Sequence, residues 1–203
     1  MVIGMTGGVG SGKSTVLQYM NEKYGAYIIL ADDVARDLMM PSGASYNSVV
    51  SFFGEDICIA GPGSEIDRGR LAKIVFDDPV LLEKLNSITH PQVKEEILRI
   101  IDRLGPEEKK LVIIEAALLI QADYTDIIDQ LWVVTTDLET RISRLYETRG
   151  YSREKTLSIM RNQLSDEEMK AYADVIIDNS GSLDDMERQI DINMDNIYAG
   201  NQG

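Results

Sequence analysis

The sequence predicts a three-layer α/β fold, in which a parallel β-sheet is covered by helices on both faces. Short apolar runs alternate along the chain with helical segments, which is typical of strand–helix–strand units. The runs are apolar throughout, as expected for strands that are buried on both faces of a parallel sheet. A chain of 203 residues with 44% hydrophobic side chains suffices to bury such a core.

Five short apolar runs are the predicted strands, and glycines or polar residues bound them. They are residues 1–6, residues 26–31, residues 111–115 ending on Glu115, the run QLWVVTT at 130–136, and the run YADVIID ending at Asp178.

Helices are predicted between these strands from their start and stop residues. Residues 14–23 form a helix that Gly25 stops, and Asp78 is the N-cap of a helix with Pro79 at its first position. Another helix begins near His90-Pro91. It carries apolar residues on one face, at Val93, Ile97, Ile101 and Leu104.

Two further helices follow the later strands. Thr136 and Glu139 form a capping box for a helix that runs toward Arg149. Ser182 opens a last amphipathic helix.

The mostly helical segment 37–105 interrupts the alternation and is expected to carry a substrate site. We therefore predict a single domain whose core is 1–36, 106–136 and 171–203, with an insertion at 37–105 and a lid at 137–170.

Charge and cysteine content exclude several classes of protein. A net charge of −14 argues against a nucleic-acid or membrane-surface partner, which needs a basic face. The single cysteine, Cys58, rules out an internal disulfide and fits a reducing compartment. Neither a signal peptide nor an apolar run of about 20 residues is visible. We expect a cytoplasmic protein that is a monomer or a weak homo-oligomer.

The stretch MTGGVGSGKST near the start fits the phosphate-binding loop pattern Gly7-x-x-x-x-Gly12-Lys13-Ser14, placed between a strand and a helix. Glycines let consecutive N–H groups surround an anion, and the positive end of the following helix points at the same place. Lys13 adds charge for the β- and γ-phosphates, and Ser14 offers a hydroxyl to Mg²⁺. The alternative is a glycine-rich turn that only joins strand to helix. The predicted ligand is ATP with Mg²⁺, and the contacts come from Gly8, Val9, Gly10, Ser11, Gly12, Lys13, Ser14 and Thr15.

Many nucleotide enzymes share this loop. GTPases need an Asn-Lys-x-Asp tetrapeptide, which does not occur here. The short chain, the early loop and an arginine-rich segment favour a small-molecule kinase of the P-loop class.

A kinase also needs a group that orients or deprotonates the acceptor hydroxyl. Asp32 and Asp33 follow the second predicted strand, at the edge where parallel sheets bind ligands. Either is a general base or a helix N-cap, and the N-cap is favoured for Asp33. Arg36, one turn on, binds a substrate phosphate or is a solvated helix residue.

Glu115 and His90 each have a functional and a structural interpretation. Glu115 ends the third strand where it would reach Mg²⁺, or it is an ordinary carboxylate at a strand end. His90, the only histidine, faces the cleft or is structural.

Five arginines lie on two predicted helices joined near Gly150: Arg141, Arg144, Arg149, Arg153 and Arg161. Such a hairpin is a natural lid that brings guanidinium groups over phosphates, the alternative being a solvated surface. Arg144 and Arg149 are the ones we select as catalytic, together with Lys13.

Several stretches, in this order, resemble the dephospho-coenzyme A kinase family nearly end to end. They are TGGVGSGKST, ADDVAR, IDRGRLAKIVFDDP, LEKLNSITHPQV and ADVIIDNSGSLDDMERQI. The His-Pro and Asp-Asn-Ser-Gly segments are much more specific than the glycine loop.

The resemblance implies transfer of the ATP γ-phosphoryl group to the ribose 3′-hydroxyl of dephospho-coenzyme A. It implies that Asp32 is the base, that Arg36 and His90 belong to the coenzyme A site, and that Gln163 is a lid glutamine. It also places Asp178, Asn179 and Gly181 in the loop near the adenine of ATP.

The sequence departs from the family pattern on the acceptor side and in the lid. Leu30 replaces the usual first aspartate, and Ala117 and Gln121 replace a proline and a glutamate. Arg149 lies five residues after Arg144 and precedes Gly150 instead of an aspartate. Two alternatives stay open: a kinase acting on another nucleoside-containing substrate, and an ATP-binding protein without catalysis.

Overall fold

The computed structural model describes residues 1–76, 78–161 and 163–200. The chain forms two compact units, Met1–Ile28 with Gly105–Gly203 and Ile29–Leu104, called here the first and second unit. Within the described residues no helix combines the length and apolar character needed to cross a bilayer.

A five-stranded sheet with the strand order β2-β3-β1-β4-β5 forms the centre of the fold. Ile3 of β1 pairs with Ile113 of β3 and with Gln130 of β4, and these pairs run parallel, as does β4 with β5. The predicted α/β class with a parallel sheet is confirmed. Four predicted strands are found within one residue at each end, and the fifth ends at Asp178 as predicted but begins three residues later, at Val175. The strands are β1 (Val2–Thr6), β2 (Tyr27–Leu30), β3 (Val112–Glu115), β4 (Gln130–Thr135) and β5 (Val175–Asp178).

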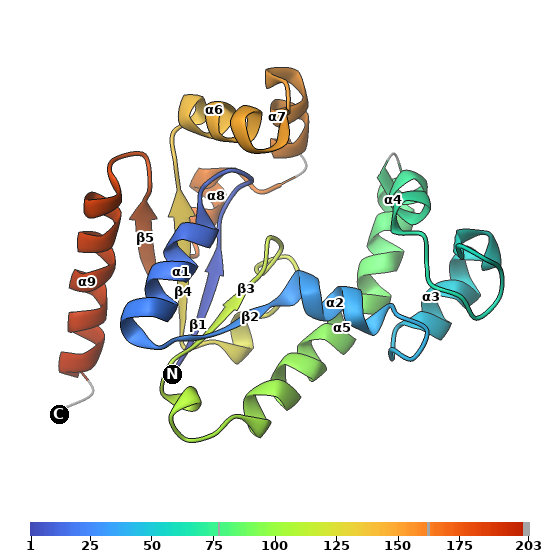
Figure 1. The fold of residues 1–203 in the computed structure, drawn as a ribbon, viewed down its shortest axis with the longest axis horizontal. Coiled ribbons are helices and arrows are strands. Elements are labelled where there is room, and N and C mark those ends of the chain that lie inside the picture. Colours follow the sequence, from blue (N-terminus) through green and yellow to red (C-terminus); the bar gives the residue numbers. More distant parts are fainter. Residues whose placement is uncertain (77, 162, 201–203) are drawn as a thin grey trace. The chain divides into compact units, whose positions relative to one another are not determined.

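One face of the sheet packs against two helices of the first unit, α1 (Lys13–Tyr24) and α9 (Leu183–Gly200) (Figure 1). The side chains that face these two helices come from every second residue of a strand, because neighbouring residues point to opposite faces of the sheet. This core consists of Ile3, Met5, Ile113, Trp132, Val134 and Ile177 from the sheet, Val16, Leu17 and Met20 from α1, Met186, Ile190 and Met194 from α9, and Ala26 and Leu111 next to β2 and β3.

The opposite face is covered by α8 (Asp166–Lys170) and by the segment after β3. Met169 of α8 is buried, and α8 contacts β4. A side chain at Gly4 of β1 would meet Leu119 and Ile128, which shows how closely this segment approaches the sheet. The helices α6 (Leu138–Arg149) and α7 (Arg153–Met160) pack against each other. Gly150 ends α6 in a left-handed conformation.

The second unit is helical and has a small core of its own. Its helices are α2 (Ala31–Leu38), α3 (Tyr46–Phe53), α4 (Arg68–Phe76) and α5 (Pro79–Arg103), and α5 packs against α2 and α4. The core residues are Tyr46, Val49, Ile57, Cys58, Ile66, Leu71 and Val75. Short 3₁₀ turns lie at Glu55–Ile57 in this unit, and at Glu108–Lys110 and Thr125–Ile127 in the first unit.

The prediction that a helix begins near His90-Pro91 is wrong. Helix α5 runs without interruption from Pro79 to Arg103, with Pro91 in its interior. Asp78 is its N-cap as predicted, and its carboxylate accepts hydrogen bonds from the backbone N–H groups of Val80 and Leu81. A proline removes one helical hydrogen bond. Apolar residues on both sides of it maintain the helix: Leu81, Leu85 and Ile88 pack on the core before it, and Val93 and Ile97 are buried after it.

Two predicted caps are also wrong. Asp137, and not Thr136, is the N-cap of α6, and its carboxylate accepts from the N–H of Thr140 at 3.0 Å. Aspartate caps a helix as well as threonine does, so the motif left the choice open. Asp33 lies inside the first turn of α2, whose N-cap position is Leu30.

Candidate functional site

The glycine loop joins β1 to α1 in a conformation that only glycine adopts easily. Gly10 and Gly12 have φ angles of 77° and 85°, in the left-handed region. A Cβ atom at Gly12 would also clash with Nδ2 of Asn179. Both backbone conformation and space therefore require glycine at position 12, directly before the first residue of α1, Lys13.

The carbonyl oxygen of Ser11 anchors this loop to the ends of two strands. Thr136, just after β4, shares its hydroxyl proton between this oxygen at 2.9 Å and the carbonyl oxygen of Thr135 at 2.7 Å, and Nδ2 of Asn179, just after β5, donates to the Ser11 oxygen at 2.9 Å. All three residues are buried. Because each partner sits at the carboxyl end of a strand, the sheet itself fixes the loop.

Lys13 and Glu115 form a partly buried ion pair beside the loop. The Lys13 Nζ donates to the carbonyl oxygen of Gly7 at 2.8 Å and lies 3.6 Å from Oε1 of Glu115. Ser14 and Thr15 are exposed in the first turn of α1. The predicted loop residues thus lie around one helix N-terminus, which attracts anions.

Arg144 of α6 is held next to the Ser11 anchor. Its Nη2 donates to the carbonyl oxygen of Asn179 at 3.0 Å, and its Nη1 donates to the Thr136 hydroxyl at 3.4 Å. A guanidinium group therefore lies beside the loop, on a helix that begins at the end of β4.

The remaining predicted lid arginines have other surroundings. Arg149 is exposed at the end of α6, and Arg161 is exposed and donates to the carbonyl oxygen of Leu157. Arg153 of α7 pairs with Glu139, which lowers the pKa of that carboxyl below its usual range.

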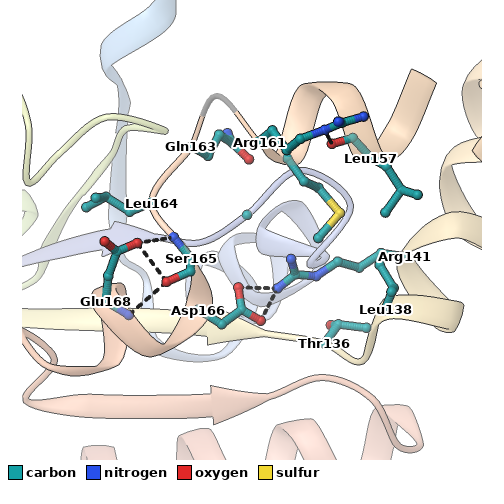
Figure 2. A pocket seen from close by; sticks show the side chains of 12 residues that line it. Thr136, Leu138, Arg141, Leu157, Arg161, Gln163, Leu164, Ser165, Asp166 and Glu168 are labelled. Carbon is teal, nitrogen blue, oxygen red and sulfur yellow. Dashed lines mark hydrogen bonds and ion pairs between the residues drawn. The ribbon is translucent and has the colours of Figure 1, made fainter. Parts of the chain in front are cut away.

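A cavity of about 640 Å³ opens between the loop and the lid helices of the first unit. Gly8, residues of α6 and α7, and the segment 163–168 line it (Figure 2). The Gln163 side chain, which the resemblance assigns to the lid, accepts a hydrogen bond from the N–H of Val9 at 2.9 Å. The lid segment thus contacts a backbone amide of the loop directly.

The residues predicted near adenine follow β5. Asp178 is exposed, and its carboxylate accepts from the N–H of Ser180 at 2.9 Å. Gly181 is exposed as well, next to Asp185. Asn179 is the buried member of this group, because its side chain anchors the loop.

The predicted acceptor residues belong to the second unit. Asp32 is exposed in the first turn of α2, and Arg36, one turn further, is exposed and pairs with Asp33 at 2.6 Å. His90 is half-buried in α5, and burial lowers its pKa. Since α2 packs on α5, the helices that carry these residues are neighbours.

Sequence reasoning missed the part that Arg141 plays. It is almost fully buried, its guanidinium lies against Gly8, and Nη2 donates to both carboxylate oxygens of Asp166 (Figure 2). The spacing of the lid arginines contained no signal for this, because the partner lies 25 residues further along the chain.

Comparisons with known proteins cover nearly the whole chain. A family model described as dephospho-CoA kinase matches residues 1–185. A dephospho-CoA kinase from Carboxydothermus hydrogenoformans is 41% identical over 189 residues, which are 93% of this chain and 90% of the relative. One from Geobacter sulfurreducens is 38% identical over 190 residues, 94% of this chain and 95% of the relative.

A solved structure agrees with the fold. The crystal structure of a Thermus thermophilus protein, 30% identical, covers 97% of both chains with a TM-score of 0.81. The family match begins before the glycine loop and ends in α9, so it includes the loop, the second unit and the lid helices. The chain belongs to the dephospho-CoA kinase family.

Proposed function

We propose that the chain transfers the γ-phosphoryl group of ATP to the 3′-hydroxyl of the ribose of dephospho-CoA, giving CoA and ADP. Membership of the dephospho-CoA kinase family supports dephospho-CoA as the substrate. One observation in the structure supports phosphoryl transfer from ATP. This is the glycine loop, which is anchored through Ser11 and opens onto the N-terminus of α1 with a lysine beside it.

The loop residues Gly8 to Thr15 would bind the triphosphate. Backbone N–H groups and the positive end of α1 attract the phosphate oxygens. Lys13 brings a point charge to the β- and γ-phosphates. Its present contacts, the Gly7 carbonyl and Glu115, keep its ammonium group at the loop before any phosphate arrives.

The donors near Lys13 fit a magnesium ion. Mg²⁺ is usually bound by one or two carboxylates or hydroxyls, with water and substrate phosphate completing its shell. Ser14 and Glu115 are such donors, and the rest of the described chain has no group of three His, Cys, Asp or Glu side chains that could hold a metal alone. The ion would neutralise the developing charge on the phosphates when bound.

The second unit would supply the acceptor. Asp32 is exposed and would orient the 3′-hydroxyl and accept its proton. Arg36 would bind a phosphate of dephospho-CoA and exchange its ion pair with Asp33 for that contact. His90, neutral at pH 7 because burial lowers its pKa, would donate or accept a hydrogen bond in the same region.

The lid would supply cations and exclude water. Arg144 is already beside the loop, whereas Arg149 is exposed at the end of α6 and would have to move. Gln163, which also lines the cavity, already contacts the loop through the N–H of Val9. Asp178, Asn179 and Gly181 would lie near the adenine. We further propose that the enzyme works in the cytoplasm as a monomer or a weak homo-oligomer.

The decisive experiment measures ADP release with dephospho-CoA as the acceptor and determines the mass of the product. The proposal predicts one CoA formed for each ADP. Release of ADP only with another nucleoside-containing acceptor would favour a kinase of different specificity, and tight ATP binding without transfer to any acceptor would favour a silent binding protein.

Two variants test the assigned roles. Asp32→Asn should lower turnover by more than about tenfold while ATP still binds, because it removes the proton acceptor and keeps the shape. Lys13→Met should weaken both ATP binding and turnover. Full turnover in the Asp32 variant would remove this carboxylate from the mechanism.

A further inference from the structure

We propose that Arg141 is a positioning residue that fixes the first half of the phosphate loop, and that position 8 is glycine because this guanidinium requires the space. The consequence for turnover rests on the proposed function. The consequence for ATP binding does not, since it concerns the loop alone.

The contact between Arg141 and Gly8 is the first observation. A Cβ atom built on Gly8 would lie 2.7 Å from Nη1, 3.1 Å from Cζ and 3.4 Å from Nη2 of Arg141. The guanidinium therefore rests on the backbone at position 8. Unlike Gly10 and Gly12, Gly8 is not among the glycines with positive φ. Its backbone would accept an alanine, and only the neighbouring side chain opposes one.

The guanidinium cannot move aside easily. Nη2 of Arg141 donates to Oδ1 of Asp166 at 2.6 Å and to Oδ2 at 2.5 Å, and the arginine side chain is 3% exposed. Its Nε is buried without a hydrogen-bond partner among the described residues. The Asp166 carboxylate is partly exposed, but the guanidinium is buried, so losing this partner would leave the charge of Arg141 uncompensated.

The same helix supports the next loop glycine. A Cβ atom at Gly10 would lie 3.0 Å from Cδ1 of Leu145, which is one helical turn after Arg141 and is also buried. Helix α6 thus forms a wall behind the loop, with Arg141 against Gly8 and Leu145 against Gly10.

The lid segment completes this support. Gln163 accepts from the N–H of Val9, and three residues later Asp166 holds Arg141 over Gly8. Two consecutive loop residues are therefore positioned from residues 163–166. The second half of the loop is fixed independently, by the contacts of Thr136 and Asn179 to Ser11.

A double-mutant cycle tests the proposal through the affinity for ATP, measured by titration calorimetry without any acceptor. Gly8→Ala and Arg141→Ala should each weaken ATP binding by about tenfold, a loss large enough to reveal coupling between residues in contact. In the Arg141→Ala background, Gly8→Ala should change the affinity by less than about twofold, because the clash is gone. Equal losses from Gly8→Ala in both backgrounds would overturn the proposal.

Asp166→Asn provides a second test that keeps the shape of the side chain, and it decides the matter if Arg141→Ala does not fold. It should weaken ATP binding several-fold, whereas Arg141→Lys should retain part of the affinity. The matched control is Glu167→Gln, which removes the same charge at the next position, where Glu167 is exposed and pairs with Lys170. The Glu167→Gln control should bind ATP as the wild type does. If Asp166→Asn also binds ATP with wild-type affinity, the proposal is overturned.

Steady-state kinetics separate positioning from general destabilisation. The KM for ATP should rise in the Asp166→Asn variant, while the KM for dephospho-CoA stays unchanged. An equal rise in both would contradict a role confined to the loop. If the wild type forms no CoA, the proposed function fails, and the calorimetric cycle still decides whether Arg141 positions the loop.

Discussion

The carbonyl oxygen of Ser11 should show non-additive losses when its two side-chain donors are removed. Thr136→Val and Asn179→Ala each remove one hydrogen bond of 2.9 Å to this buried oxygen and leave the other in place. A single lost hydrogen bond costs about 1 kcal/mol of unfolding free energy when the acceptor keeps another donor. The double variant leaves the oxygen without either donor, which adds a desolvation cost of about 1–3 kcal/mol.

The expected free energies translate into measurable melting temperatures. At about 2–4 °C per kcal/mol for a chain of this length, each single variant should melt about 2–4 °C lower, and the double variant about 6–20 °C lower. Trp132 reports the transition, since it is the only tryptophan and is fully buried in β4 of the first unit. A double variant whose loss equals the sum of the single losses would refute the role of Ser11 as a shared anchor.

Three further predictions concern helix caps and titrating groups. Asp137→Ala should lower the unfolding free energy by about 1 kcal/mol in urea denaturation followed by Trp132 fluorescence, because α6 loses its N-cap; an unchanged midpoint would exclude this cap. His90 should titrate below about 6.5 in an NMR titration of the only histidine, since burial lowers its pKa. Its contribution to stability is therefore present above pH 6.5 or so and is lost as the pH falls through the folded pKa; a titration above 6.5 would contradict this. Burial raises the pKa of Asp191, but hydrogen bonds from Lys23 and two tyrosines outweigh it and leave the pKa lowered. Unfolding followed against pH should show stability falling below about pH 4 in the wild type and less steeply in Asp191→Asn, whereas parallel curves would argue against it.

The parts of the fold that local sequence determines were predictable. The strand, the glycines and the lysine of the phosphate loop are consecutive, and the left-handed glycine at position 12 follows from the motif itself. The strands were predictable because burial on both faces of a sheet leaves continuous apolar runs. The start of α5 was predictable too, because an aspartate N-cap followed by proline at the first helical position is a local signal.

The parts that depend on tertiary contacts were not predictable. Pro91 is a helix breaker by itself, and only the buried residues on either side of it maintain α5. Thr136 resembles a helix cap in sequence, but its hydroxyl bonds to Ser11, 125 residues away. Arg141 resembles any other lid arginine until its pairing with Asp166 is seen.

The most direct test of the proposed reaction is to identify where the phosphoryl group goes. Purified protein is incubated with ATP, Mg²⁺ and dephospho-CoA, and the product is analysed by mass spectrometry and ³¹P NMR. We expect a product that is heavier by one phosphoryl group, carries it on the 3′-oxygen of the ribose, and forms in step with ADP. Release of ADP with unmodified dephospho-CoA, or a phosphoryl group on another atom, would contradict it.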